Sequence, residues 1–106
     1  MEDAVRKRIE NDVKGNKVFL YMKGTPEQPQ CGFSGRAVAI LKEYNVPFKS
    51  FNIFEDEAIR QGVKEYADWP TFPQLYVNGE LVGGCDIMME MHEKGELAKI
   101  LEKARA

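Results

Sequence analysis

The sequence predicts an α/β fold in which helices cover both faces of a four-stranded mixed sheet. Two observations lead to this fold class. Segments with helical apolar spacing alternate with short strand-like segments, and an Asn78-Gly79 turn then joins two further strands. With 106 residues, the chain is long enough for one compact domain, residues 1–106, with a single hydrophobic core.

The first predicted helix ends at Gly15 and has one apolar face. Its apolar residues recur every four positions, at Val5, Ile9 and Val13. Residues 17–22 follow and are apolar on both faces, which is typical of a central strand covered on both sides. Residues 24–30 contain two prolines and are predicted to form a loop.

The middle of the chain predicts a helix over 34–44, a strand over 48–53 and a helix over 56–66. The strands of a hairpin follow at 74–77 and 80–82, because Asn-Gly strongly favours a two-residue turn.

Two helices, near 86–92 and 96–105, end the chain, and we write the order as αβαβαββα. A βαβ unit followed by a hairpin and a closing helix is the arrangement of the thioredoxin-type sandwich.

Composition excludes several function classes. The formal net charge is −2, and Lys and Arg are scattered rather than massed, so no nucleic-acid surface is expected. The longest apolar runs are far too short for a membrane span. The start of the chain is acidic and has no apolar signal region. Two cysteines argue for a reducing compartment. We expect a cytoplasmic protein if the source is bacterial, and a mitochondrial-matrix or plastid protein if it is a processed eukaryotic form.

Cys31 is the candidate reactive residue, because it follows a strand and opens a helix. Free backbone N–H groups and the helix dipole favour a thiolate there. A dithiol enzyme would carry its second cysteine three residues later, where this chain has Ser34. Such a site can attack a mixed disulfide with glutathione or ligate a metal centre. The plainer alternatives are a buried structural cysteine and a Ser34 that caps or begins the helix.

Four motifs stand in order along the chain: Met22-Lys23-Gly24-Thr25, Cys31-Gly32-Phe33-Ser34, Trp69-Pro70-Thr71-Phe72-Pro73-Gln74 and Gly83-Gly84-Cys85-Asp86. With these motifs the chain resembles the monothiol glutaredoxins of the Cys-Gly-Phe-Ser class over nearly its whole length. The resemblance implies a thioredoxin-like fold, glutathione binding and, in most members, a 2Fe–2S cluster bridged across a homodimer.

Ligand counting for such a cluster leaves two possibilities. A 2Fe–2S cluster generally takes four thiolates, and Cys31 from two chains supplies two. The resemblance implies that two glutathione molecules supply the rest. Alternatively, Cys31 and Cys85 of both chains make four. The segment around Cys85 argues against the second possibility, because it resembles a binding segment for the γ-glutamyl end of glutathione.

The resemblance also implies contacts to the glycyl carboxylate of glutathione. Lys23 follows the central strand and can meet this carboxylate. Arg60 is a candidate for the same group, and Lys64 lies four residues further on the same helix face. The alternative for all three is an ordinary solvated surface charge.

The remaining glutathione contacts fall on two segments. The resemblance implies a cis Phe72–Pro73 bond after Thr71, which turns the backbone of Phe72 toward the glutathione cysteine. Gly84 permits close backbone approach, and the helix that Cys85 and Asp86 open can bind the γ-glutamyl carboxylate. Asp86 could meet the ammonium group or act as an N-cap, and both roles are compatible. Cys85 either lines the site, which we favour, or forms a disulfide with Cys31.

Other side chains are interpreted as structural. Trp69 and Pro70 are assigned to packing and chain direction, and Phe33 either covers the Cys31 sulfur or anchors the loop. His92, the single histidine, is predicted to be a surface or half-buried helix residue. The methionines of that helix are assigned to packing rather than to a metal site.

Two functions compete. The leading hypothesis is a carrier that passes its cluster to acceptor apoproteins, with BolA-like proteins as further partners that the resemblance suggests. The alternative is a glutathione-dependent oxidoreductase acting through Cys31 alone, with weak turnover. A regulatory sensor would use the same site as the carrier. The sequence does not identify the acceptors or the oligomeric state without cluster.

Overall fold

The computed structural model describes residues 1–105, and its strands form one sheet in the order β2-β1-β3-β4. The central strand β1 (Val18–Met22) pairs in parallel with β2 (Lys49–Asn52) and antiparallel with β3 (Gln74–Val77). β3 also pairs antiparallel with β4 (Glu80–Gly83). The predicted four-stranded mixed sheet of the thioredoxin-like fold is therefore confirmed.

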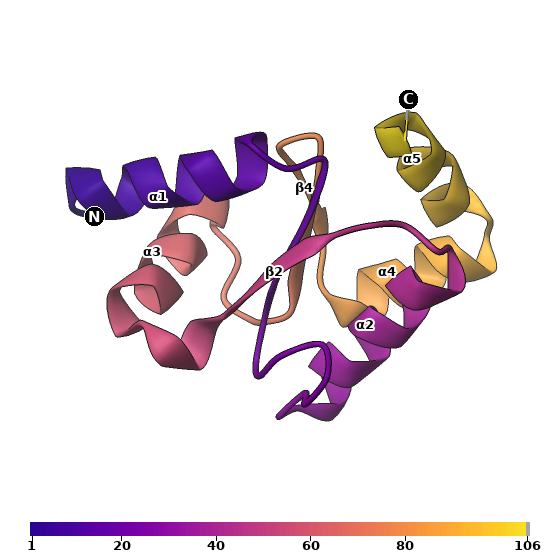
Figure 1. The fold of residues 1–106 in the computed structure, drawn as a ribbon, viewed down its shortest axis with the longest axis horizontal. Helices are drawn as coiled ribbons and strands as arrows, with labels where there is room; N and C mark the ends of the chain where they lie inside the picture. Colours follow the sequence, from indigo (N-terminus) through magenta and orange to yellow (C-terminus); the bar gives the residue numbers. More distant parts are fainter. Residues whose placement is uncertain (106) are drawn as a thin grey trace.

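Helices cover both faces of this sheet (Figure 1). One face carries α1 (Asp3–Lys14) and α3 (Glu57–Ala67). The other face carries α2 (Gly32–Glu43), α4 (Cys85–Glu93) and α5 (Glu96–Arg105). The two predicted closing helices are confirmed as α4 and α5. Among residues 1–105, no helix combines the length and the apolar character needed to cross a membrane.

The strand β1 divides the core between the two faces, because successive side chains of a strand point to opposite sides. Val18, Leu20 and Met22 pack on the side of α2, α4 and α5. Phe19 and Tyr21 pack on the side of α1 and α3. All five are buried, as expected for the doubly covered central strand that the sequence predicts.

Several boundaries differ slightly from the predictions, and two of the differences have a clear local cause. α2 begins two residues before the predicted start at residue 34, because Cys31 has an extended backbone (φ −156°, ψ 135°) and occupies the N-cap. A short 3₁₀ helix, Ile53–Glu55, was not predicted. It begins where the side-chain oxygen of Asn52 accepts a hydrogen bond from the N–H of Phe54 at 3.0 Å.

The turn between β3 and β4 has the predicted form. Asn78 and Gly79 both have positive φ, at 52° and 82°. A type I′ turn requires this conformation at both central positions, and its twist matches that of the flanking strands. The turn places Val77 opposite Glu80 and Tyr76 opposite Leu81, and a register shift between Tyr76 and Leu75 then brings Gly83, at the end of β4, opposite Leu75.

Candidate functional site

Cys31 is positioned by the loop between β1 and α2, and backbone hydrogen bonds join the two ends of this loop. The N–H of Gln30 donates to the Lys23 carbonyl at 2.9 Å, and Gly24 forms an isolated β-bridge with Pro29. Gly24 has φ 90°, and its N–H donates to the side chain of Asn52 at 3.0 Å. These bonds tie the loop to the C-terminal ends of β1 and β2. Cys31 therefore lies at the end of the sheet where these two strands finish.

Cys31 is half-exposed at the N-cap of α2. The backbone N–H of Ser34 in the first turn of α2 is the largest influence that holds the pKa of the Cys31 thiol below its ordinary value, against the opposing effect of partial burial. The N–H of Phe33, the positive charge of Lys23 and the Ser34 hydroxyl act in the same direction. These influences agree in direction with the predicted preference for thiolate at a helix N-terminus, and a thiol in such a position is suited to act as a nucleophile or a metal ligand.

Ser34 joins the helix to the central strand rather than capping the helix. It is fully buried, and its hydroxyl accepts a hydrogen bond from the N–H of Lys23 at 3.0 Å. Cys31 occupies the N-cap instead, so the interpretation of Ser34 as the cap is wrong.

The segment before β3 lies beside Cys31 and has the cis Phe72–Pro73 bond that the resemblance implies. Gln74 supports it from inside the fold. Its amide is fully buried and donates to the carbonyls of Trp69 at 3.0 Å and Thr71 at 3.2 Å, while its oxygen accepts from the Tyr76 hydroxyl at 2.9 Å. The buried amide thereby fixes the backbone from Trp69 to Thr71.

Two glycines bring the start of α4 close to this segment. A Cβ on Gly84 would lie 3.2 Å from the Pro73 carbonyl oxygen, tighter than ordinary contact. Gly83 has φ 144°, and a Cβ there would lie 2.8 Å from Ile87. Gly84 is the N-cap of α4, so the N-cap interpretation of Asp86 is wrong. Asp86 is exposed in the first turn, where a carboxylate interacts favourably with the helix dipole.

These elements enclose a cavity of about 340 Å³. Seven of the predicted site residues line it: Lys23, Cys31, Thr71, Phe72, Gly84, Cys85 and Asp86. The fold therefore brings together residues from all four motifs, which are far apart in the sequence. A volume of this size is within the range of small-molecule sites.

Arg60 and Lys64 are not among the residues that line this cavity. Both lie on α3. A guanidinium nitrogen of Arg60 lies 3.5 Å from the Glu57 carboxylate, and its buried Nε has no hydrogen-bond partner among the described residues. Their contact with a glycyl carboxylate stays a prediction.

Sequence reasoning missed part of the lining. Ile87 lies one helical turn after Gly84 and was not considered, although the i, i+3 spacing could have indicated it. Trp69 was assigned to packing, yet it lines the cavity, and its buried indole N–H has no partner among the described residues. Phe33 also lines the cavity and is 57% exposed, so it does not anchor the loop in the core.

Cys85 differs from Cys31 in its environment. Both thiols are free, but Cys85 is only 5% exposed. Burial raises the pKa of the Cys85 thiol, and the charges of Asp86 and Cys31 add to this rise, whereas the Arg36 guanidinium opposes it. Cys85 is therefore the less nucleophilic of the two thiols at neutral pH.

The other candidate side chains have structural contacts. His92 is half-buried, as predicted, and bridges the Tyr44 hydroxyl and the Glu43 carboxylate, the latter at 3.0 Å. Met88 is buried in the core and Met91 packs against it. Within residues 1–105, no group of three or more His, Cys, Asp and Glu side chains is arranged to hold a metal ion.

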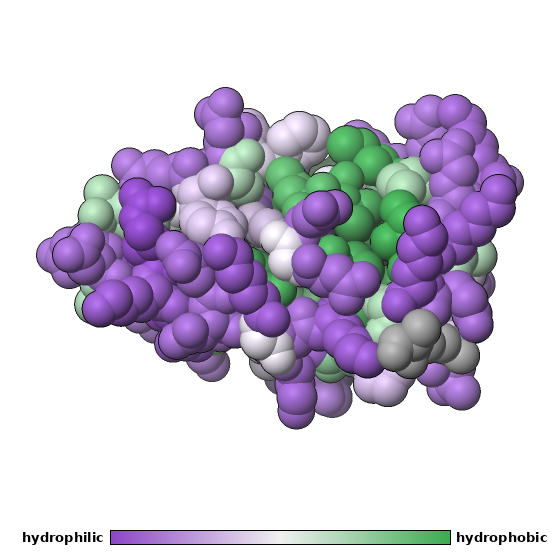
Figure 2. All heavy atoms as spheres, turned by 90° about the horizontal axis from the view of Figure 1, so that it is seen from above, coloured by the Kyte–Doolittle hydropathy of each residue, from purple (hydrophilic) through white to green (hydrophobic). Residues whose placement is uncertain are grey.

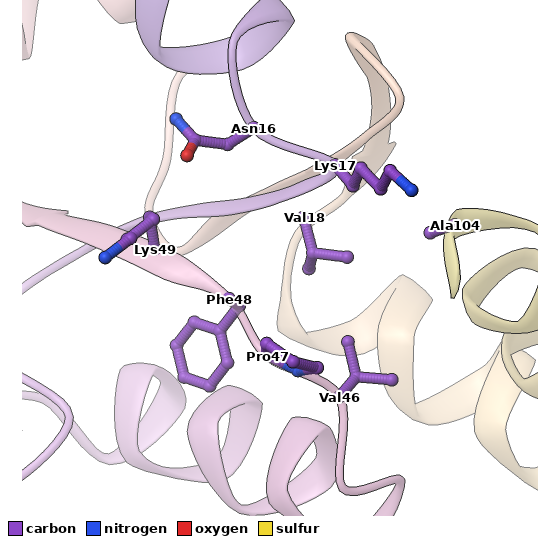
Figure 3. Close-up of a pocket in the computed structure, with 8 residues that line it drawn as sticks. All are labelled: Asn16, Lys17, Val18, Val46, Pro47, Phe48, Lys49 and Ala104. Atoms are coloured by element: carbon purple, nitrogen blue, oxygen red, sulfur yellow. The ribbon is translucent and has the colours of Figure 1, made fainter. Parts of the chain in front are cut away.

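A second cavity, of about 530 Å³, lies at the opposite end of the sheet. Val18 begins β1 and Lys23 follows its end, so the two cavities are separated by roughly 17 Å of strand. Figure 2 views this end of the molecule and shows an apolar hollow bordered by hydrophilic side chains. In Figure 3, Val18 and Val46 point toward Ala104, and Lys17 extends over the space between them. The eight lining residues include no thiol, carboxylate or histidine.

Comparison with known proteins agrees with this geometry. The glutaredoxin family model matches residues 18–82. A Rickettsia typhi protein named probable monothiol glutaredoxin 2 is 55% identical over 102 residues, which cover 96% of this chain and 92% of that protein. Monothiol glutaredoxin-S11 of Oryza sativa is also 55% identical over 102 residues, but this chain spans only 21% of its length.

A solved structure shows the same fold. The solution structure of reduced poplar apo GrxS14 is 53% identical and superimposes with a TM-score of 0.85, covering 95% of this chain and 93% of that one.

Proposed function

The chain belongs to the glutaredoxin family, among its monothiol members, and we propose that it binds glutathione and carries a 2Fe–2S cluster to acceptor apoproteins. One observation carries this proposal. Cys31 is a half-exposed thiol with a lowered pKa beside the 340 Å³ cavity, and the position of a second redox cysteine holds the buried Ser34. This supports a site that offers one protein thiolate to an external partner.

Ligand counting supports glutathione as that partner. A 2Fe–2S cluster generally takes four thiolates, so Cys31 of two chains and two glutathione thiolates complete the set across a homodimer. Cys85 is a weaker candidate, because it is buried and its pKa is raised. The cluster is cargo in this proposal, and glutathione ligands exchange more readily than protein thiolates.

The cavity offers groups that match each part of glutathione. Lys23 and, from outside the lining, Arg60 and Lys64 are proposed for the glycyl carboxylate. The backbone of Phe72, which follows Thr71 at the cavity wall, is proposed to pair with the cysteinyl unit. The N-terminus of α4 at Gly84 and Cys85 receives the γ-glutamyl carboxylate. The Asp86 carboxylate meets the ammonium group.

The test is anaerobic reconstitution of the full chain with iron, sulfide and glutathione, followed by size exclusion and transfer to an apoferredoxin. We expect a coloured dimer that loses its colour to the acceptor. Cys31→Ser should stay colourless, whereas Cys85→Ala should keep the colour. A colourless wild type, or a coloured Cys31→Ser, would contradict the proposal.

The lowered pKa of Cys31 also supports a second candidate, reduction of glutathione mixed disulfides. The Cys31 thiolate attacks the glutathione sulfur, forms a Cys31–glutathione disulfide and releases the target thiolate, which takes up a proton. A second glutathione thiolate then attacks this disulfide, giving oxidised glutathione and free Cys31. Brisk Cys31-dependent turnover of hydroxyethyl disulfide by a protein that stays colourless would favour this enzyme over the carrier.

The proposed partners follow from the carrier role. They are glutathione, a second copy of the chain, acceptor apoproteins and BolA-like proteins as heterodimer partners. We expect the protein in the cytoplasm of a bacterium, or in the mitochondrial matrix or plastid of a eukaryote.

A further inference from the structure

The 530 Å³ cavity at the far end of the sheet has no part in the proposed glutathione site. Three segments meet there: the start of β1, residues 46–48 between α2 and β2, and the end of α5. None of its lining residues lines the cavity beside Cys31. Its volume lies within the range of about 300–1,000 Å³ that is typical of small-molecule sites. The chemistry of its own lining therefore decides which ligand fits it.

The floor of this cavity is apolar. Val18, Val46 and Ala104 are at most 7% exposed and belong to the core between the sheet and α2, α4 and α5. Phe48 is half-buried and packs against the same core. Because these side chains are already held by core contacts, they form a preformed surface for an apolar ligand group. Figure 2 shows this apolar hollow, with hydrophilic side chains around it.

The rim of the cavity is positively charged. Lys17 and Lys49 line it and are exposed, and neither ammonium group has an ion-pair partner among the described side chains. No carboxylate lines the cavity, although acidic residues outnumber basic ones by 17 to 15 in the whole chain. In Figure 3, Lys17 extends over the hollow toward Ala104, and Lys49 lies on the other side. The rim is therefore complementary to an anion.

Floor and rim together narrow the ligand class. A small inorganic anion would leave the apolar floor uncovered, and a neutral hydrocarbon would not interact with the two lysines. A protein partner typically covers a broad surface of about 800 Å² on each side, whereas this site is a hollow of small-molecule size. A carboxylate on an apolar chain satisfies both parts, because one lysine over the hollow balances its single negative charge.

We propose that this cavity binds an aliphatic carboxylate of medium chain length. The carboxylate lies at Lys17, and the chain covers Val18, Val46 and Phe48. Lys49 adds a second positive charge from the opposite side of the rim. Each fully buried methylene group favours binding by about fourfold, whereas an exposed ion pair adds at most about fivefold. The chain therefore supplies most of the affinity, and Lys17 supplies the orientation and the preference for an anion.

The test is an NMR titration of the full chain with octanoate, followed through the backbone amide signals. We expect saturable shift changes at Val18, Val46, Phe48 and Ala104, and none at Cys31. Two further probes separate the parts of the ligand. Butyrate keeps the charge but lacks four methylene groups, so it should bind at least about tenfold more weakly. Octanol keeps the chain but lacks the charge, so it should bind about two- to fivefold more weakly.

Exchange of the lysines tests the recognition of charge. Lys17→Gln should weaken octanoate binding about two- to fivefold and leave octanol binding unchanged, and Lys49→Gln should have a smaller effect in the same direction. These are exposed side chains, so the fold should be retained. Lys7→Gln, an exposed lysine of α1 outside this cavity, is the matched control and should bind octanoate like the wild type.

Three outcomes would overturn the inference. Octanol could bind as tightly as octanoate, Lys17→Gln could bind octanoate like the wild type, or the shift changes could lie outside this cavity. Shift changes at the same amides that depend on protein concentration without any ligand would identify a second copy of the chain as the occupant, and would also overturn it. Lys17→Gln should still reconstitute the 2Fe–2S dimer, so failure of this site and failure of the carrier role are distinguishable.

Discussion

The Ser34 hydroxyl accepts a hydrogen bond from the backbone N–H of Lys23 at 3.0 Å. This bond joins the first turn of α2 to the end of β1, eleven residues earlier in the chain. It thereby fixes the distance between the two residues that frame the loop, Lys23 and Cys31. A serine at this position therefore has a structural role besides leaving the site with one redox thiol.

Ser34→Ala should lower the free energy of unfolding by about 1–2 kcal/mol, because the partly buried N–H of Lys23 loses its acceptor. Urea denaturation measures this change. Ser50→Ala, on the half-exposed strand β2, is the control and should stay within about 0.5 kcal/mol of the wild type. Equal stability of the two variants would show that the bond contributes nothing.

Lys23→Gln should raise the pKa of the Cys31 thiol, because the positive charge of Lys23 favours the thiolate. The rate of alkylation by iodoacetamide follows the thiolate fraction, so its pH profile should shift to higher pH and the rate at pH 7 should fall. Lys17→Gln, at the other end of β1, should leave the profile unchanged. A Lys23→Gln profile that coincides with the wild type would refute the electrostatic role of Lys23.

Gln74→Leu should cost about 2–4 kcal/mol of stability, because it leaves the Trp69 and Thr71 carbonyls and the Tyr76 hydroxyl without partners. It should also weaken glutathione binding, since the loop beside Cys31 loses its support. Urea denaturation and isothermal titration with glutathione report the two effects. Gln61→Leu removes only an exposed contact to Glu57, so both quantities should hardly change in that control.

Gly84→Ala should weaken glutathione binding by about fivefold or more, equivalent to about 1 kcal/mol, because its Cβ would lie 3.2 Å from the Pro73 carbonyl oxygen at the cavity wall. Gly35→Ala is the matched control, since its Cβ would meet Pro29 at an ordinary 3.5 Å. Titration calorimetry with glutathione compares them. Identical affinities would mean that the close approach at Gly84 is not needed for the ligand.

The sequence was sufficient for features that depend on local pattern. The doubly apolar run before Lys23 predicted a strand covered on both faces, and Asn78-Gly79 predicted the hairpin turn. Features that depend on contacts between distant residues were not predictable. Ser34, for example, is an acceptor for a residue on another element. The 3₁₀ helix Ile53–Glu55 was missed for a different reason: the Asn52 side chain accepts a local hydrogen bond from the N–H of Phe54, and such a bond leaves no periodic signal.

The candidate site shows the same division. The motifs predicted seven of the lining residues, Cys31 among them, because each motif combines residues with a chemical purpose. Trp69 and Ile87 were missed as lining residues, since apolar side chains at these positions are equally compatible with packing. Only the fold shows that they face the cavity.

The number of glutathione molecules in the reconstituted dimer tests the central claim most directly. The account predicts one 2Fe–2S cluster, two chains and two glutathione molecules in the purified complex, measured by iron analysis, native mass spectrometry and release of glutathione on acid treatment. A stable coloured dimer that contains no glutathione and loses its cluster on Cys85→Ala would contradict it, because four protein thiolates would then hold the cluster.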